Sequence, residues 1–226
     1  MPVLPSLATA LKTERLLLRA CSTSQAGALC SALRKNRAHL EPWTPLATPD
    51  YFTLTGTSER IAKWRAEWRK GKSFHFHVYE KRRTPIVGHV ALTGIDRGVL
   101  ENAYLGYWID GQCAGKRYAA EAVAKVIQFG FAELKLHRIQ ASVMPRNVRS
   151  VRVVEHLGFR NEGTALRYLK IHGQWEDHLI FATTDEEWRE RGLEKITNNQ
   201  AGSLIATLED SNMNVYARHE SFAKKL

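Results

Sequence analysis

The chain has 226 residues, of which 44% are hydrophobic and 25% are charged, and its formal net charge is +10. A chain of this length and apolar content buries a full core as a single domain without help from metals or disulfides. The three cysteines are odd in number and widely spaced, which argues against a disulfide framework, and no apolar run approaches the roughly 20 residues that span a bilayer. We therefore expect a soluble, cytoplasmic protein without a membrane partner, whose positive charge suits a polyanionic ligand or particle.

The first part of the chain predicts a strand followed by two amphipathic helices. Residues 13–19 (TERLLLR) form a short apolar run, and a helix with hydroxyl residues at its start comes next. After a proline-rich segment, Thr57 or Ser58 can cap the second helix. Trp64 and Trp68 lie one turn apart on its apolar face, where they form either core or the lip of a substrate groove.

The middle of the chain predicts a hairpin, and after it a strand that leads into the longest helix. Between residues 74 and 92 the apolar pattern has a period of two around a charged turn, which is typical of an antiparallel hairpin. A further strand covers residues 104–109, and apolar residues three and four apart predict a helix over residues 119–134. A strand at residues 138–143 and a short helix at residues 151–157 follow.

Two late strands joined across His172 and Gly173 complete the predicted domain. We place this domain at residues 1–191. Residues 192–226 are polar and rich in Asn and Ser, and we expect them to form a C-terminal tail.

The loop before the longest helix is a candidate anion site. It reads AGKRYA over residues 114–119, so small residues lie next to the predicted helix start. A helix N-terminus presents unpaired N–H groups and the positive end of the helix dipole, which can bind a pyrophosphate. A glycine beside a helix start is also an ordinary turn, and the loop alone leaves both interpretations open.

Six segments in a fixed order resemble one known family. They are TERLLLR, NRAHLEPWTP, YLGYWI, AGKRYAAEA, HRIQASVMPRNVRSVRVVEHLGF and GQWEDHLIFA, and they span residues 13–188. With them the sequence resembles the GNAT superfamily, and within it the RimJ/RimL group of ribosomal-protein N-terminal acetyltransferases. Collinear segments are far more specific than a single motif. The resemblance implies an α+β fold of the GNAT (acyl-CoA N-acyltransferase) type, with a mostly antiparallel mixed sheet flanked by helices.

The resemblance also implies acetyl-CoA as cosubstrate and a set of residues that bind it. The implied positions are Tyr107, Trp108, Ile109, Gly115, Lys116, Arg117, Tyr118, Ala119 and Asn147. The strand residues would pair their backbone with pantetheine, and the loop would hold the pyrophosphate. The family's loop pattern, Gln/Arg-x-x-Gly-x-Gly/Ala, falls here on Ala114, Arg117 and Ala119, so only its last position is kept. We expect binding to survive, with the Arg117 guanidinium contacting a cofactor phosphate.

Three residues are candidates for catalysis. The resemblance places Ser150 near the cofactor sulfur, where its hydroxyl can stabilise the departing thiolate. Asn147 and Ser150 are also residue types that cap helices, and both roles can coexist. Many members of this family carry a glutamate where this chain has Tyr104. The nearest carboxylate is Glu101, which is otherwise a solvated surface residue. Tyr104 either relays a proton through water or packs as an ordinary strand aromatic.

The expected acceptor is the N-terminal α-amine of a protein, typically a ribosomal one. Deprotonating an α-amine of pKa ~7.8 at pH 7 costs about 1 kcal/mol, against roughly 4.6 kcal/mol for a lysine, which suits a site with a weak base. A small-molecule amine is one alternative acceptor. A non-catalytic CoA-binding or ribosome-associated module is another alternative, suggested by the departures from the family pattern. We expect a monomer or homodimer that makes no direct sequence-specific contact with nucleic acid.

His75 and His77 share one face of a predicted strand and could chelate zinc. No third and fourth ligand lies at a telling distance along the sequence. We therefore expect no metal site.

Overall fold

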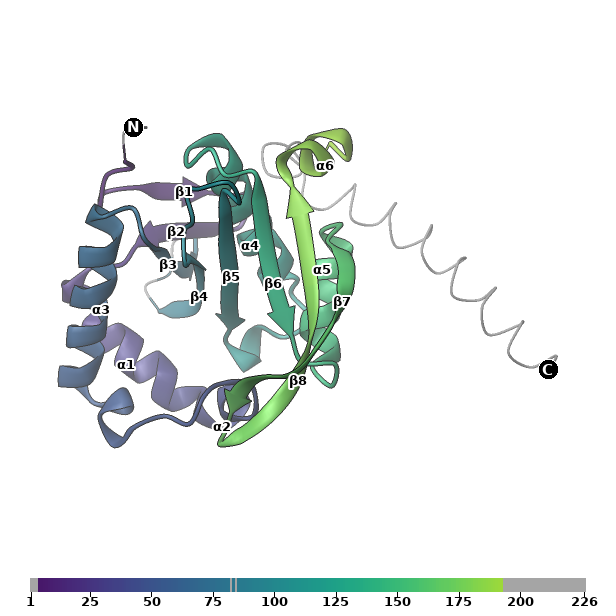
Figure 1. Cartoon of the computed structure of the whole chain (residues 1–226). Coiled ribbons are helices and arrows are strands. Elements are labelled where there is room, and N and C mark those ends of the chain that lie inside the picture. Colours follow the sequence, from purple (N-terminus) through teal and green to yellow (C-terminus); the bar gives the residue numbers. More distant parts are fainter. Residues whose placement is uncertain (1–3, 82, 84, 193–226) are drawn as a thin grey trace.

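The fold is one eight-stranded sheet with helices on both faces (Figure 1). The computed structural model describes residues 4–81, 83 and 85–192. The strands are β1 (Ala10–Lys12), β2 (Leu16–Ala20), β3 (Phe74–Glu80), β4 (Ile86–Thr93), β5 (Asn102–Ile109), β6 (Arg138–Val143), β7 (Arg160–Ile171) and β8 (Gln174–Thr184). The helices are α1 (Ala26–Lys35), α2 (Arg37–Leu40), α3 (Leu54–Arg69), α4 (Tyr118–Ala132), α5 (Val148–His156) and α6 (Asp185–Glu190), with short 3-10 turns between some of them.

The sheet has the order β1-β2-β3-β4-β5-β6-β8-β7, and all neighbours are antiparallel except β5 and β6. The predicted mixed, mostly antiparallel sheet is thereby confirmed. β5 and β6 pair over three residues only, the last pair being Tyr104 with Gln140. β5 nevertheless continues to Ile109 and stays paired with β4 over that whole length. The two parallel strands therefore separate toward their C-terminal ends, as Figure 1 shows.

Alternating side chains on β3 divide the two faces of the sheet. Phe74 and Phe76 belong to the main core, which β3 shares with α4. His75 and His77 lie on the other face, where Trp64 of α3 stacks on His75 with ring centroids 4.4 Å apart. The period of two that predicted the hairpin thus reflects a strand buried on both sides, with aromatic rings on one face and imidazoles on the other.

Helix α3 begins earlier than the sequence suggested. Thr53 is its N-cap, because the Thr53 hydroxyl accepts the N–H of Gly56 at 3.1 Å, so the prediction of Thr57 or Ser58 as cap was wrong. A Cβ on Gly56 would lie 2.2 Å from the carbonyl oxygen of Asp50. The first turn therefore packs backbone against backbone, a contact that leaves no apolar periodicity in the sequence.

The second tryptophan of α3 is a core residue. Trp68 is 2% exposed, and its ring lies 4.8 Å from that of Phe74 and 5.2 Å from that of Phe76. Its indole N–H donates to the carbonyl of Pro5 at 2.7 Å, which satisfies the one polar group of the ring.

Glu121, in the first turn of α4, fastens the N-terminal segment to this helix. One of its oxygens accepts the Thr13 hydroxyl and the Arg15 backbone N–H, and the other pairs with the Arg15 guanidinium at 2.6 Å. Glu121 is buried, and a buried carboxylate is stable only when donors surround it in this way. The TERLLLR segment is therefore bonded directly to α4, the helix that follows the candidate anion loop.

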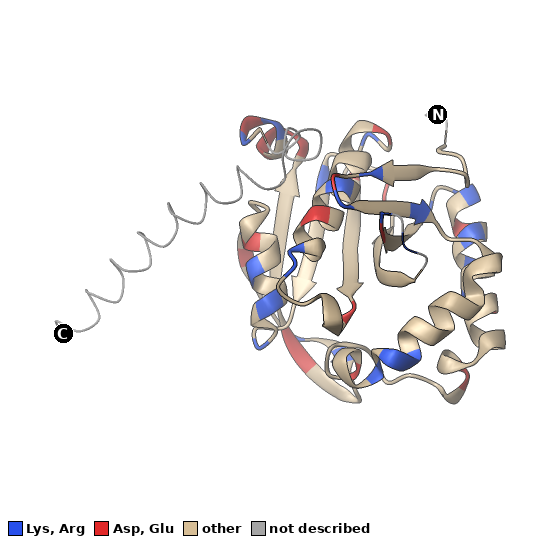
Figure 2. Cartoon of the chain, turned by 180° about the vertical axis from the view of Figure 1, so that it is seen from behind, with Lys and Arg blue, Asp and Glu red and all other residues tan. Residues whose placement is uncertain are grey.

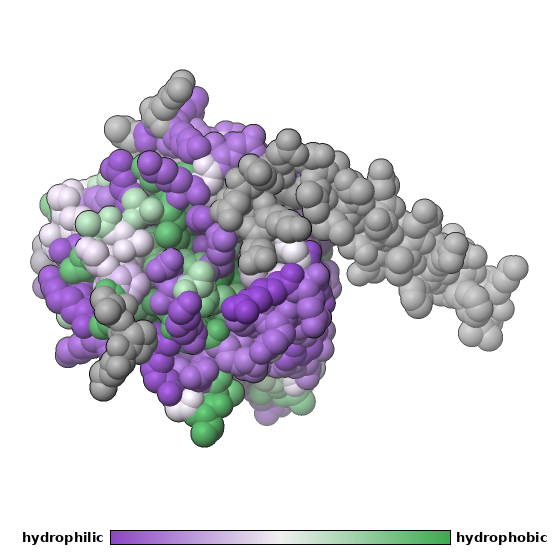
Figure 3. Space-filling view, turned by 90° about the horizontal axis from the view of Figure 1, so that it is seen from above, coloured by the Kyte–Doolittle hydropathy of each residue, from purple (hydrophilic) through white to green (hydrophobic). Residues whose placement is uncertain are grey.

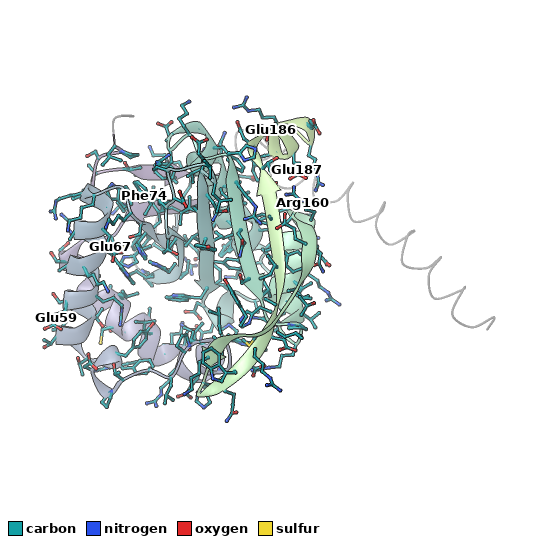
Figure 4. The ribbon with its side chains drawn as sticks, in the orientation of Figure 1. Glu59, Glu67, Phe74, Arg160, Glu186 and Glu187 are labelled. Carbon is teal, nitrogen blue, oxygen red and sulfur yellow. The ribbon has the colours of Figure 1, made fainter. Side chains whose placement is uncertain are left out.

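The C-terminal end of the described domain is held by α6. A capping box of Thr184 and Glu187 starts this helix, and Arg160 of β7 pairs with Glu187 at 2.5 Å (Figure 4). Residues 193–226 lie outside the described part of the chain. The division into a domain up to residue 191 and a tail from residue 192 stays a prediction.

The described surface mixes charges of both signs. Seen from the edge that carries α6, hydrophilic residues dominate, with small apolar groups between them (Figure 3). Basic positions follow α5 on the face that it forms with α4 (Figure 2). None of the helices in the described ranges combines the length and the apolar character needed to cross a bilayer. The three cysteines are unpaired and buried.

Candidate active site

The open edge of β5 is the centre of the candidate site. Beyond Tyr104, the side of β5 that faces β6 has lost its strand partner, while its other side remains bonded to β4. Backbone N–H and C=O groups on this edge are therefore available to a ligand that lies along the strand. Tyr107, Trp108 and Ile109, predicted to contact pantetheine, all fall within this stretch.

Helix α4 starts at the end of this edge and supplies the amides of an anion site. The N–H groups of its first turn, from Tyr118 to Ala120, point out of the helix and have no intrahelical acceptor. Gly115, two residues before the N-cap, has φ +79°, and a Cβ placed on it would meet nothing within 4 Å. The loop is exposed there, so a phosphate can approach its backbone.

Arg117 adopts the backbone conformation that the family glycine would provide. It is the N-cap of α4 with φ 58° and ψ 17°, in the left-handed region. Such a conformation costs a non-glycine residue about 1 kcal/mol. Arg117 is an exposed residue. The loop therefore keeps the shape that the pattern requires, at a cost in strain.

The side chains of two predicted loop residues, Lys116 and Tyr118, contact Glu80, a carboxylate that the sequence analysis had not considered. The Tyr118 hydroxyl donates to Glu80 Oε1 at 2.9 Å, and Lys116 Nζ lies 3.2 Å from the same oxygen. These bonds, that of Tyr118 first, lower the pKa of Glu80. Glu80 at the end of β3 therefore fixes the loop, and the contribution of Tyr118 to an anion site comes from its backbone N–H.

Helix α5 brings Ser150 against the open strand. Asn147 caps this helix, with its Oδ1 accepting the N–H of Ser150 at 3.3 Å, so its capping role is confirmed. The Ser150 hydroxyl lies 2.8 Å from the hydroxyl of Tyr107 on β5. The Tyr107 hydroxyl also lies 3.2 Å from the Ser150 carbonyl oxygen and can donate to it. The two side chains thus bridge the strand that carries the open edge and the helix opposite it.

Tyr107 stays protonated at neutral pH. Burial raises its pKa to about 12, and the hydrogen bond with Ser150 opposes this shift only in part. When Ser150 turns its hydrogen toward a developing anion, Tyr107 can donate to the serine oxygen at the observed 2.8 Å. The pair is therefore suited to stabilising negative charge on a leaving group.

Glu101 and Tyr104 lie at different places relative to β5. Glu101 precedes the strand, at the closed end, where its carbonyl accepts the N–H groups of His137 and Arg138. Six residues of extended chain, about 20 Å, separate it from Tyr107, so the structure does not bring Glu101 to the Ser150 pair. Tyr104 lies at the point where β5 and β6 part, with 42% of its surface exposed.

A family model described as an acetyltransferase (GNAT) domain matches residues 15–160. The chain belongs to this family. The probable N-acetyltransferase YjcK of Bacillus subtilis is 37% identical over 172 residues, which cover 76% of this chain and 95% of YjcK. The [ribosomal protein uS5]-alanine N-acetyltransferase of Escherichia coli is 33% identical over 178 residues, covering 79% and 92%. The structure of Mycobacterium smegmatis RimJ in complex with CoA-disulfide superposes with a TM-score of 0.80 at 30% identity, covering 86% of this chain and 96% of RimJ.

As a GNAT acetyltransferase, the chain is an enzyme that uses acetyl-CoA. Its own geometry fits this cosubstrate, because the open edge of β5 leads directly to the exposed amides of α4. Acetyl-CoA would bring the activated acetyl thioester, and the edge of β5 and the first turn of α4 would hold it. The expected resemblance, fold class and cosubstrate are thereby confirmed, while the roles of individual site residues stay predictions.

Sequence reasoning missed three side chains that shape this site. Tyr107 was expected to contribute only its backbone, and Glu80 and Glu121 were not considered. Glu80 could have been found as the last residue of a predicted hairpin strand, where a carboxylate is uncommon. Glu121 could have been found as the one acidic residue in the first turn of a mostly apolar helix.

Proposed function

We propose that this acetyltransferase modifies the N-terminal α-amine of a ribosomal protein. The main structural support for acetyl transfer at this site is the Tyr107–Ser150 pair beside the open edge of β5. The acceptor class is supported by the E. coli relative, which is named for alanine acetylation of ribosomal protein uS5. A ribosomal acceptor also agrees with the net charge of +10, which favours association with RNA-rich particles.

The reaction is a direct transfer within a ternary complex. The neutral amine attacks the thioester carbonyl, and the N–H groups on the open edge of β5 stabilise the resulting oxyanion, a contribution of about 2.7–4 kcal/mol per donor in comparable sites. The C–S bond then breaks with its electron pair on sulfur. Ser150 donates its hydrogen bond to that thiolate, supported by Tyr107. The amine proton leaves through water, for which exposed Tyr104 is the candidate relay at the strand junction.

The site offers only weak bases, which suits an α-amine as the acceptor. Neither Tyr104 nor Ser150 is a strong base at pH 7, and Glu101 lies at the far end of β5. An α-amine needs only about 1 kcal/mol for deprotonation at pH 7, so solvent can take its proton. A lysine side chain needs roughly 4.6 kcal/mol and would react several-hundredfold more slowly by this route.

Mass spectrometry of matched peptides tests the proposal. One peptide begins with a free alanine, a second has the same sequence with a blocked N-terminus and one internal lysine, and a panel of small amines completes the set. Each is incubated with the enzyme and acetyl-CoA. We expect one acetyl group on the α-amine of the first peptide and on none of the others. Acetylation of only the lysine peptide or only the small amines would contradict the acceptor assignment.

We also propose that the enzyme works in the cytoplasm and meets its acceptor near the ribosome. Co-sedimentation with ribosomes that weakens as salt rises is the expected sign of this association, because phosphate contacts are screened by salt. Sedimentation that is absent at low salt would restrict the enzyme to free ribosomal proteins.

A further inference from the structure

A buried group of one cysteine and two histidines lies on the face of the sheet opposite α4. Cys21 Sγ and one ring nitrogen each of His77 and His89 lie within 4.8 Å of one another. Cys21 directly follows β2, His77 lies on β3 and His89 on β4. Their exposed fractions are 2%, 0% and 8%. Neither the acetyl-transfer chemistry nor the cofactor site uses any of these three residues.

The tautomer of His77 is fixed by its surroundings. The backbone N–H of Ser22 donates to Gln25 Oε1 at 2.9 Å, which identifies that atom as the amide oxygen. His77 Nδ1 lies 3.0 Å from the same oxygen and must therefore donate to it. A neutral imidazole that donates through Nδ1 has no proton on its other ring nitrogen. Its Nε2 consequently carries a lone pair.

That lone pair and the matching atom of His89 lack partners. Among the described residues, neither His77 Nε2 nor His89 Nδ1 has a hydrogen-bond partner, although both atoms are buried. His89 Nε2 lies 3.2 Å from His75 Nδ1, and donation from His89 leaves its Nδ1 as an acceptor as well. His75 Nε2 in the same cluster also lacks a partner among the described residues. Buried polar atoms are nearly always satisfied, so these nitrogens require an explanation, and those of His77 and His89 lie beside a thiol.

We propose that Cys21, His77 and His89 bind a zinc ion. Thiolate sulfur and imidazole nitrogen are the ligands that zinc prefers. Gln25 already accepts the Nδ1–H of His77, as outer-shell residues do in zinc sites. Ligand atoms around tetrahedral zinc lie roughly 3.3–3.6 Å apart, so closing the group takes movements of about 1 Å. Three protein ligands leave one coordination position for a further donor.

Charge balance also determines the chemistry of binding. Cys21 is a free, buried thiol. Binding forms the sulfur–zinc bond and releases the thiol proton to solvent. The resulting thiolate offsets the positive charge of Arg60, which acts against a dication at this place.

The ion would join parts of the fold that are distant in sequence. It would tie the end of β2 to β3 and β4, and through Gln25 to the start of α1. His89 pairs in register with Trp108 of β5. One ligand of the ion would therefore lie on the strand next to β5, whose open edge is the cofactor site. Trp64 covers the group, with its ring 4.8 Å from that of His89. The inferred role is to rigidify the sheet behind the active site.

Cobalt substitution tests the site with the full-length chain. The protein is stripped with a chelator and titrated with Co²⁺, then with Zn²⁺. We expect one Co²⁺ per chain, a thiolate-to-cobalt charge-transfer band in the near ultraviolet, and loss of that band when Zn²⁺ displaces cobalt. Cys21→Ser should abolish the band. Cys30→Ser, a matched change at another buried cysteine, should retain it.

A second variant keeps the test decisive if Cys21→Ser fails to fold. Gln25→Ala leaves all three ligands in place and removes the acceptor that orients His77. We expect its zinc affinity to fall about 10- to 100-fold, the usual effect of removing an outer-shell partner. Thermal unfolding without metal verifies that each variant is folded. A wild-type chain that binds no Co²⁺, or a charge-transfer band that survives Cys21→Ser, would overturn the proposal.

Discussion

Replacing Tyr107 by phenylalanine removes one hydroxyl and isolates the support that it gives to Ser150. The bond in question joins the two side-chain oxygens at 2.8 Å. A neutral hydrogen bond contributes about 0.5–1.5 kcal/mol net, and 1.36 kcal/mol corresponds to a tenfold change in rate. We therefore expect kcat to fall about twofold to twelvefold in Tyr107→Phe. KM for acetyl-CoA should change little, because the backbone that holds the cofactor is untouched.

A double-mutant cycle shows whether Tyr107 acts through Ser150. Ser150→Ala should lower kcat by about 10- to 150-fold, because a hydrogen bond to a charged group contributes about 1.5–3 kcal/mol. In the Ser150→Ala background, the Tyr107→Phe change should have no further effect on kcat, since the group that it supports is gone.

The assay is thiol release from saturating acetyl-CoA with an acetylatable N-terminal peptide. Tyr79→Phe provides the control, because Tyr79 is a buried tyrosine that lies on β3 in the cluster beneath α1 and α3. Thermal unfolding verifies that each variant is folded. If Tyr107→Phe lowers kcat equally with and without the serine, the two hydroxyls act independently and the paired mechanism is refuted.

Three further predictions follow from the same geometry. Arg117→Gly should raise the stability by up to about 1 kcal/mol, or about 2–4 °C in Tm, by relieving the left-handed strain, whereas Arg117→Ala should not; equal Tm values in calorimetry would contradict this. Glu101→Gln should leave kcat within about twofold, because the side chain lies at the closed end of β5; a fall of more than tenfold in thiol release would restore a catalytic role for it. The pH profile of kcat/KM should rise as the acceptor α-amine loses its proton near pH ~7.8 and then stay level to about pH 10. The reason is that the raised pKa of Tyr107, about 12, keeps its hydroxyl protonated throughout; a decline above pH 9 would show that a group with a lower pKa is required.

The sequence predicted the strands and helices well where periodic burial produced them. β6 and the β3–β4 and β7–β8 hairpins appeared where alternation and turn residues indicated, and His172 and Gly173 both have the positive φ that a tight hairpin turn needs. The start of α3 was missed because it depends on a backbone contact at Gly56 rather than on apolar side chains.

The candidate site was predictable only in part. Backbone positions on β5 and α4 followed from the resemblance, because they depend on the order of elements and not on residue type. The Tyr107–Ser150 pair could not be found, since 43 residues separate its members and either is ordinary alone. The group of Cys21, His77 and His89 could not be found for the same reason, because three strands must assemble before its atoms meet.

The contact of Glu121 with Thr13 and Arg15 has a consequence for how the enzyme assembles. It joins residues 106 and 108 positions apart, so its formation closes a long loop and carries the entropic cost of that closure. The anion-binding turn of α4 and the N-terminal strand should therefore gain protection from hydrogen exchange together and lose it together. A deletion that removed residues up to 15 would damage the cofactor end of the enzyme, although no atom of that segment needs to touch the cofactor.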